Sequence, residues 1–220
     1  MKNTISDASL SQFSELVATQ MGLYFPRERY RDLEREAGHA AGDFGFEDSE
    51  SCIQWLLASP LTKSRIKVLA SHLTVGETHF FRDRNLFEVL ERHILPELIQ
   101  RRQAERRLRI WSAGCSTGEE PYSIAILLSK FANDLKGWNI SIMATDINPL
   151  SLRVASKGVY GEWSFRDTPE WIKQGYFKST QEGRYKIHRH IKKMVKFSGW
   201  FSIRVTLSEE GMKKIGQTSQ

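Results

Sequence analysis

The sequence has few of the features that mark membrane, secreted and metal-binding proteins. Its 220 residues hold two cysteines, Cys52 and Cys115, too few and too far apart for a disulfide framework or a metal site, so we expect two reduced thiols and no metal. No run approaches the roughly 18 apolar residues of a membrane-spanning helix, and the N-terminus lacks a signal peptide's apolar core. With 40% apolar and 26% charged residues, we expect a soluble, cytoplasmic protein of one large or two small domains.

Acidic residues are scarce towards the C-terminal end. Residues 178–220 hold 10 Lys and Arg against 3 Asp and Glu, whereas residues 1–75 hold 8 against 10. A basic face attracts nucleic acid, anionic membrane or an acidic protein equally well, so charge alone does not select the partner. No nucleic-acid motif accompanies the charge, and we expect neither nucleic-acid binding nor membrane insertion.

The most informative stretch is residues 108–122, LRIWSAGCSTGEEPY. A β-favouring apolar run leads into a Gly/Ser/Thr turn, and a helical segment follows with Pro121 in its first turn. Gly114 and Gly118 allow tight turning and close approach of the backbone to a ligand. This succession predicts a ligand-binding loop at the carboxyl end of a strand.

Three kinds of ligand compete for this loop. The dinucleotide fingerprint G-x-G-x-x-G is absent, and Glu119 and Glu120 at the start of the helix would repel a pyrophosphate. The run also matches the G-x-S-x-G nucleophile elbow, with Ser116 as nucleophile, but the upstream residues look helical and only His188 and His190 could be its partners. A cationic, phosphate-free cofactor such as S-adenosylmethionine suits an acidic loop best.

A second β-favouring run, residues 140–145, ends in Asp146. Open α/β sheets place at that position the acidic residue that binds ribose hydroxyls, although Asp146 lies 28 residues after Gly118 and the usual interval is about 20. The alternative is a turn or helix N-cap, because Asp-Ile-Asn-Pro is rich in turn formers. The two strands together favour the ribose role.

Periodicity and turn chemistry predict the other elements. Pro26 opens a helix that we expect to end near Gly38. Residues 184–188 and 194–197 are short β-like runs separated by a basic turn, which predicts a hairpin. Apolar residues at helical spacing also predict helices over 7–21, 52–58, 62–72, 84–107 and 147–157.

Three motifs closely resemble the CheR-type chemotaxis receptor methyltransferases. They are TVGETHFFRD at residues 74–83, IWSAGCSTGEEPYSIA at 110–125 and ATDIN at 144–148. The run STGEEPYS is highly specific, and the other two motifs are each moderately so. The resemblance covers roughly residues 5–197.

The resemblance implies an α/β fold in three parts. These are a small helical domain at 1–75, a linker and leading helix at 76–107, and a Rossmann-like S-adenosylmethionine-dependent methyltransferase domain at 108–220 with an antiparallel β-subdomain at about 160–197. After Phe197 the family's Asn-Leu pair and Cys-Arg-Asn motif are absent. We therefore expect a chain that is truncated or altered after about residue 197, with an incomplete sheet, and that folds poorly in isolation.

The resemblance also implies an activity and a partner. Members of the family transfer a methyl group from S-adenosylmethionine to glutamate side chains in the cytoplasmic helical region of methyl-accepting chemotaxis receptors, making γ-glutamyl methyl esters, and we expect a monomer. In some members the β-subdomain docks a receptor's C-terminal peptide by strand addition. Two alternatives stay open: a non-catalytic receptor-docking module and an inactive remnant.

Cofactor contacts carry over to seven positions. The linker motif supplies Thr78 and Arg82, and Gly76 stands where the family often has Asn. Arg82 is also the candidate catalytic residue, orienting the substrate carboxylate or the cofactor's own by a bidentate bond; its alternative is a structural ion pair with Asp83 or Glu77. The positions in the loop and the second strand are Ala113, Gly114, Glu120 and Asp146.

Overall fold

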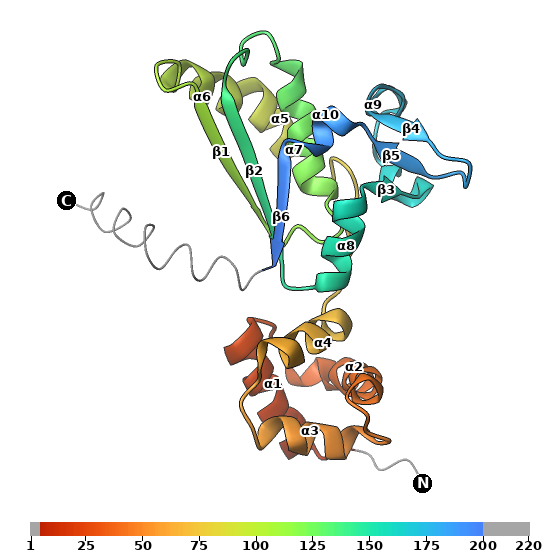
Figure 1. Cartoon of the computed structure of the whole chain (residues 1–220). Coiled ribbons are helices and arrows are strands. Elements are labelled where there is room, and N and C mark those ends of the chain that lie inside the picture. The colour runs from red at the N-terminus through yellow and green to blue at the C-terminus, as the bar shows by residue number, and fades with distance from the viewer. Residues whose placement is uncertain (1–4, 200–220) are drawn as a thin grey trace, which may run out of the picture. The chain divides into compact units, whose positions relative to one another are not determined.

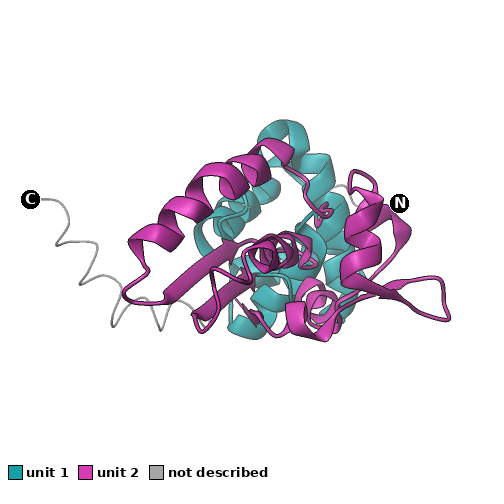
Figure 2. Ribbon diagram, turned by 90° about the horizontal axis from the view of Figure 1, so that it is seen from above, with its two compact units in different colours: residues 1–75, 147–149 teal, residues 76–146, 150–220 magenta. Residues whose placement is uncertain are grey.

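The computed structural model describes residues 5–199, which fall into two compact units (Figure 1, Figure 2). Within the described residues, the first unit comprises residues 5–75 and 147–149, and the second comprises residues 76–146 and 150–199. Most of the expected departure from the family falls on residues 200–220, which lie outside the described part. No helix within residues 5–199 is long and apolar enough to cross a membrane.

The first unit is a set of helices with its own core. In helix α1 (Asp7–Met21), Leu10, Phe13 and Val17 recur at helical spacing and are buried. Ser6 caps this helix by accepting the N–H of Ser9 at 3.1 Å. The other helices of the unit are η1 (Arg27–Arg29), α2 (Tyr30–Asp43), α3 (Ser49–Leu57) and α4 (Lys63–Leu73).

Helix α2 continues past the point where the sequence predicted its end. Gly38 lies inside the helix, so the expectation that the helix ends near Gly38 was wrong. Ala40 and Ala41, which follow it, are both buried. Packing of these residues outweighs the penalty of an internal glycine, which is about 1 kcal/mol relative to alanine.

The second unit is built on a parallel sheet of three strands in the order β1-β2-β6 (Figure 1). Strand β1 (Arg107–Ala113) pairs with β2 (Asn139–Asp146), and β2 pairs with β6 (Val195–Gly199). Helix α7 (Glu119–Lys130) contacts β2 and β6 and is buried along most of its length. The second edge of β1 has no strand partner within residues 5–199.

A smaller antiparallel sheet in the order β3-β5-β4 forms the β-subdomain. It consists of β3 (Val159–Tyr160), β4 (Phe177–Ser179) and β5 (Tyr185–Ile187). The predicted hairpin between 184–188 and 194–197 was wrong, because β5 pairs with β4, whereas the second run is β6 of the parallel sheet. Helix α10 (Arg189–Lys192) separates the two runs. Both runs are short, and such runs carry no signal of which strand they will pair with.

Phe80, in the linker, is at the centre of the aromatic core of the second unit. Its ring stacks on Phe165 at 5.0 Å and meets Tyr160 and Phe177 edge-on, each at 4.9 Å. Such pairs contribute about 0.5–1.5 kcal/mol beyond area burial, so the linker is fixed to the β-subdomain. The remaining helices of the chain are α5 (Arg84–Val89), η2 (Leu90–Ile94), α6 (Leu95–Arg101), α8 (Pro149–Lys157), η3 (Glu162–Phe165) and α9 (Glu170–Tyr176).

The predicted α/β fold class is confirmed. A helical N-terminal region precedes a parallel sheet whose strand β1 leads through a glycine-containing turn into helix α7, and an antiparallel subdomain is added to this unit. The arrangement brings the loop after β1 to the same sheet edge as the end of β2, because the carboxyl ends of neighbouring parallel strands coincide.

Candidate functional site

The loop between β1 and α7 is shaped by two glycines with different roles. Both have a left-handed backbone, with φ of +71° at Gly114 and +94° at Gly118. A Cβ on Gly118 would lie 2.8 Å from Cβ of Ala155, so this glycine lets α8 pack closely on the loop. A Cβ on Gly114 would meet nothing within 4 Å. Gly114 and the neighbouring Ala113 are exposed, and they form the open side of the loop.

Asp146 joins the end of β2 to this loop. One of its carboxylate oxygens, Oδ2, accepts the backbone N–H of Ser116 at 2.7 Å. The Ser116 hydroxyl in turn donates to the backbone carbonyl of Gly76 at 3.2 Å. The structure therefore brings together three predicted segments: the linker motif, the glycine loop and the acidic end of the second strand.

The two glutamates that open α7 have different environments. Glu119 is buried, and its carboxylate accepts the hydroxyls of Thr117 at 2.6 Å and Ser164 at 3.0 Å. Burial raises the pKa of the Glu119 carboxyl, and these hydrogen bonds oppose the rise. Glu120 is exposed, and it accepts the hydroxyl of Ser112 at 2.6 Å. Of this pair, Glu120 is the one placed to meet a ligand.

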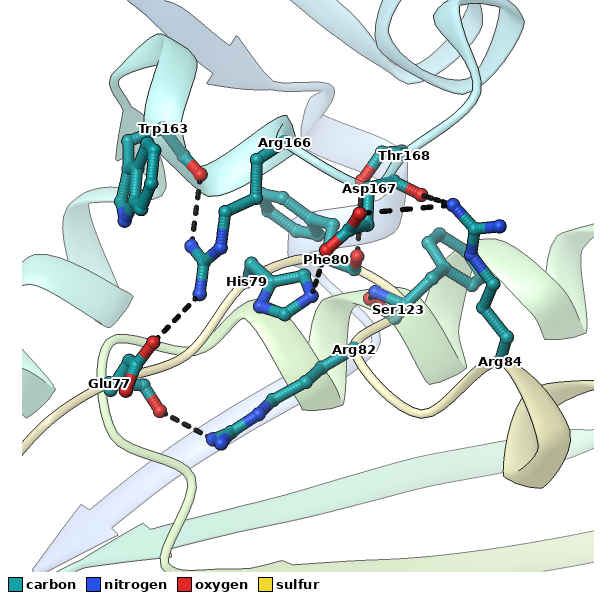
Figure 3. A network of polar contacts seen from close by, with 11 residues as sticks. Glu77, His79, Phe80, Arg82, Arg84, Ser123, Trp163, Arg166, Asp167 and Thr168 are labelled. Carbon is teal, nitrogen blue, oxygen red and sulfur yellow. Dashed lines mark hydrogen bonds and ion pairs between the residues drawn. The ribbon is translucent and has the colours of Figure 1, made fainter.

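Arg82 is exposed at the end of the linker motif (Figure 3). Its Nη1 donates to the backbone carbonyl of Glu77 at 2.8 Å, and the guanidinium forms no ion pair among residues 5–199. The alternative of a structural ion pair with Asp83 or Glu77 was wrong, because Asp83 caps α5 by accepting the N–H of Leu86 at 2.9 Å, and the Glu77 carboxylate pairs with Arg166 at 3.3 Å. The Arg82 charge stays available to an anion.

These residues fit S-adenosylmethionine in charge and in shape. The carboxylates of Glu120 and Asp146 suit the ammonium and hydroxyl groups of such a cofactor, and the open backbone at Gly114 permits close approach. Thr78, which is half-buried, and the exposed Arg82 supply a hydroxyl and a cation that can bind a carboxylate. The seven positions stay predicted cofactor contacts.

The nucleophile-elbow alternative finds no support in the geometry. Ser116 does have the strained backbone expected of an elbow, with φ of +47°. Its hydroxyl, however, donates to the Gly76 carbonyl and to no histidine among the described residues. His188 is instead the N-cap of α10 and His190 lies within that helix, with their ring centroids 5.8 Å apart. Without a base, Ser116 is not an activated nucleophile.

A cavity of about 590 Å³ lies elsewhere in the second unit. Its lining comes from Phe81, α5, η2, the end of α7, α9 and the turn before α9, and none of the seven predicted cofactor positions contributes to it. The chemistry of the glycine loop therefore identifies the candidate site better than cavity size does. The lining residues include Phe81, Arg84, Phe87, Arg166, Asp167 and Trp171.

Sequence reasoning missed several residues that hold the linker motif in place. Ser123, in the STGEEPYS motif, accepts the N–H of Phe81 at 3.0 Å. Thr168 donates its hydroxyl to the carbonyl of Phe80 at 3.0 Å, across 88 residues of sequence. Ser123 could have been suspected from its motif. No recognisable motif surrounds Thr168, and only the fold reveals its contact.

Comparison with known proteins agrees with this geometry. Residues 76–200 match the family described as CheR methyltransferase, SAM binding domain; S-adenosyl-L-methionine is the ligand of that domain. A probable chemotaxis protein methyltransferase of Rhizobium etli is 36% identical over 146 residues, which make up 65% of this chain and 54% of the relative. A chemotaxis protein methyltransferase of Borreliella burgdorferi is 29% identical over 196 residues, 88% of this chain and 69% of the relative.

Another relative is chemotaxis protein methyltransferase 2 of Vibrio cholerae, which is 34% identical over 133 residues, 60% of this chain and 46% of the relative. The chain thus spans about half the length of two of these three relatives and about two thirds of the other. The family match covers more than half of the chain and includes residues 76–83 of the linker motif, the glycine loop and Asp146. The chain belongs to the CheR methyltransferase family.

Proposed function

We propose that this chain methylates glutamate side chains of chemotaxis receptors with S-adenosylmethionine, forming γ-glutamyl methyl esters. The observation that carries the proposal is the acidic, open loop: Glu120 and Asp146 are held at a glycine turn whose outer side is free. The family of the matched domain and the names of the relatives support the same reaction class. Such receptors present their methylated helices in the cytoplasm, which is where we place the reaction.

The proposed reaction needs no general base. A glutamate side chain has a pKa of about 4.3 and is already ionised at pH 7. S-adenosylmethionine, when bound, supplies an electrophilic methyl group on a positively charged sulfur. The task of the protein is then to bind both reactants and align them, which can supply a large part of a rate enhancement.

Residues of this chain divide that task. Glu120 and Asp146 bind cationic and hydroxyl groups at the loop, and Gly114 lets the backbone come close. Arg82 orients a carboxylate by parallel N–H···O bonds, because its guanidinium forms no ion pair among residues 5–199. The partner is a receptor helix that presents a glutamate. Strand β4, whose outer edge is unpaired within the described residues, can add a peptide strand in the manner proposed for some family members.

Calorimetric titration with S-adenosylhomocysteine tests the cofactor site. We expect binding in the micromolar range, and Asp146→Asn should weaken it at least about tenfold, because a hydrogen bond to a charged group contributes about 1.5–3 kcal/mol. Asp134→Asn is the matched control, since Asp134 is exposed and forms no contact with the site. A folded chain that does not bind S-adenosylhomocysteine would overturn the proposal.

Methyl transfer to a receptor fragment tests the chemistry. The fragment is incubated with S-adenosylmethionine labelled on the methyl group, and alkali is then added. Methyl esters release labelled methanol in base, whereas N-methyl groups do not. If the chain binds the receptor but not the cofactor, it is a non-catalytic docking module. If it binds neither, it is an inactive remnant.

A further inference from the structure

We propose that the hydroxyls of Ser123 and Thr168 act as a clamp on one peptide group, the one between Phe80 and Phe81, and thereby position Arg82. The inference deepens the proposed function, because it explains how the linker motif is aimed at the cofactor loop. It makes Ser123 and Thr168 positioning residues, which act through Arg82.

Two hydroxyls from different elements hold the two ends of this peptide group (Figure 3). The carbonyl of Phe80 accepts from Thr168 Oγ1 at 3.0 Å. The N–H of Phe81 donates to Ser123 Oγ, also at 3.0 Å. Ser123 comes from helix α7, and Thr168 comes from the turn between η3 and α9. With both ends bound, the peptide plane can neither flip nor tilt without breaking a hydrogen bond.

The Ser123 hydroxyl is itself fixed in the orientation that the clamp needs. Its proton is donated to the backbone carbonyl of Glu119 at 2.7 Å. A lone pair of the same oxygen is then directed at the N–H of Phe81, because a hydroxyl has one donor and two acceptor positions. Ser123 is fully buried, so water does not compete for these bonds.

The clamped peptide precedes a strained residue. Phe81 has a φ of +55°, a left-handed conformation that is uncommon and unfavourable for a bulky side chain. Such a conformation persists only where the surroundings fix it. The next residue is Arg82, so the left-handed turn at Phe81 sets the direction in which the arginine leaves the backbone.

Further contacts hold the same loop to residues 164–168 of the β-subdomain. The N–H of Phe80 donates to the carbonyl of Ser164 at 2.9 Å. The guanidinium of Arg84 donates to the backbone carbonyl of Asp167 at 3.2 Å, whereas Nε2 of His79 lies 3.1 Å from Oδ2 of Asp167 without a hydrogen bond between them. Among residues 5–199, the Arg82 side chain has a single hydrogen bond, to the Glu77 carbonyl. Its position therefore depends on the backbone more than on its own side-chain contacts.

The first test removes each hydroxyl and measures the response of the linker. In Thr168→Val and in Ser123→Ala, the amides of residues 80–84 should exchange with deuterium severalfold faster than in the wild type. Ser129→Ala is the matched control on helix α7, because the Ser129 hydroxyl bonds to the Ile126 carbonyl and to the Tyr176 hydroxyl and does not contact the linker. Thr168→Ser keeps the hydroxyl and should restore slow exchange. Unchanged exchange in both hydroxyl-deleted variants would disprove the clamp.

The second test asks whether the two residues act through Arg82. Affinity for S-adenosylhomocysteine and kcat/KM for methyl transfer are measured for Thr168→Val, Arg82→Ala and the double variant. We expect Thr168→Val to lower at least one of these about fivefold, the effect of one hydrogen bond, with a melting temperature lowered by no more than a few degrees. When Arg82 is already replaced by alanine, Thr168→Val should change that affinity or kcat/KM by less than about twofold. An equal loss in both backgrounds would show a merely structural role.

The two tests separate this inference from the proposed function. If the wild type does not bind S-adenosylhomocysteine, the proposed function fails, whereas deuterium exchange still decides whether the peptide clamp exists. If the wild type binds and Thr168→Val binds and turns over equally well, the positioning role fails and the proposed function stands.

Discussion

Glu119 and Glu120 are adjacent residues of the same type whose roles differ because of their surroundings. Glu119 is buried and bound by two hydroxyls, whereas Glu120 is exposed at the glycine loop. A buried carboxyl favours its protonated form, which is why its pKa rises. Two neighbouring glutamates thus have different roles: Glu119 is a structural residue, and Glu120 is a candidate ligand-binding residue.

The raised pKa of Glu119 predicts a pH-dependent stability. Between the ordinary glutamate pKa of about 4.3 and the raised value, the folded state binds more protons than the unfolded state, so the free energy of unfolding falls as pH rises through this window. Measured relative to Glu119→Gln, the wild type should gain stability as pH is lowered through the window towards about 4.3. Urea titrations at several pH values measure this difference, and a difference independent of pH would contradict the prediction.

Arg82 gives the second prediction at the residue scale. Arg82→Lys keeps the charge but loses the bidentate geometry, so kcat/KM for methyl transfer should fall about tenfold to a hundredfold. Arg101→Lys is the control, because Arg101 is an exposed helix residue that pairs with Glu97 within its own helix. Steady-state kinetics on a receptor fragment measure both variants. Unchanged turnover at saturating substrate would remove the orienting role.

At the scale of elements, the unit of strand β1, glycine loop and helix α7 depends on close packing against α8. Gly118→Ala would place a Cβ 2.8 Å from Cβ of Ala155 and 3.1 Å from the hydroxyl of Tyr160, at a φ of +94°. We expect a loss of roughly 2–4 kcal/mol in the free energy of unfolding, from backbone strain and overpacking together.

Thermal and urea unfolding measure the Gly118→Ala effect. Gly175→Ala is the matched control, because a Cβ on Gly175 meets nothing within 4 Å and its φ is not positive. That variant should change the free energy of unfolding by less than about 1 kcal/mol. If the two variants were equally stable, the close approach at Gly118 would not limit packing.

At the scale of the whole molecule, the chain divides into two units with separate cores. The seven candidate cofactor positions all belong to the second unit. S-adenosylhomocysteine at a hundred times its dissociation constant stabilises the unit that binds it by about 2.7 kcal/mol. Calorimetry should therefore show one transition that rises by about 5–10 °C with the ligand and one that does not move. A single transition that shifts as a whole would show that the two units unfold together.

The expectation that the chain folds poorly stays a prediction at this scale. Strand β1 has an unpaired edge within residues 5–199, and an open edge of a parallel sheet is prone to association. A cooperative melt of the second unit above about 45 °C, a value typical of mesophile domains, would contradict it. Light scattering during the melt reports whether association accompanies unfolding.

Predictions from the sequence were correct where local residue preferences determine the secondary structure. The β-strand that ends at the glycine loop, Pro121 in the first turn of α7, and Asp146 at the end of β2 all lie where the pattern placed them. Predictions failed where packing outweighs local preference. Helix α2 runs through Gly38 because buried alanines follow it, and the strand that ends near Phe197 pairs with β2 and not with β5.

The sequence by itself determined the α/β class, the family and the chemistry of the candidate site, because glycines, acids and the linker arginine are recognisable from their types and spacing. Only the tertiary structure decided which residues hold that site in place. Ser123 and Thr168 both bind one peptide group. Ser123 lies 42 residues after Phe81, and Thr168 lies 88 residues after Phe80. Contacts across such separations depend on the packing of α7 and the β-subdomain around Phe80, and no local pattern encodes them.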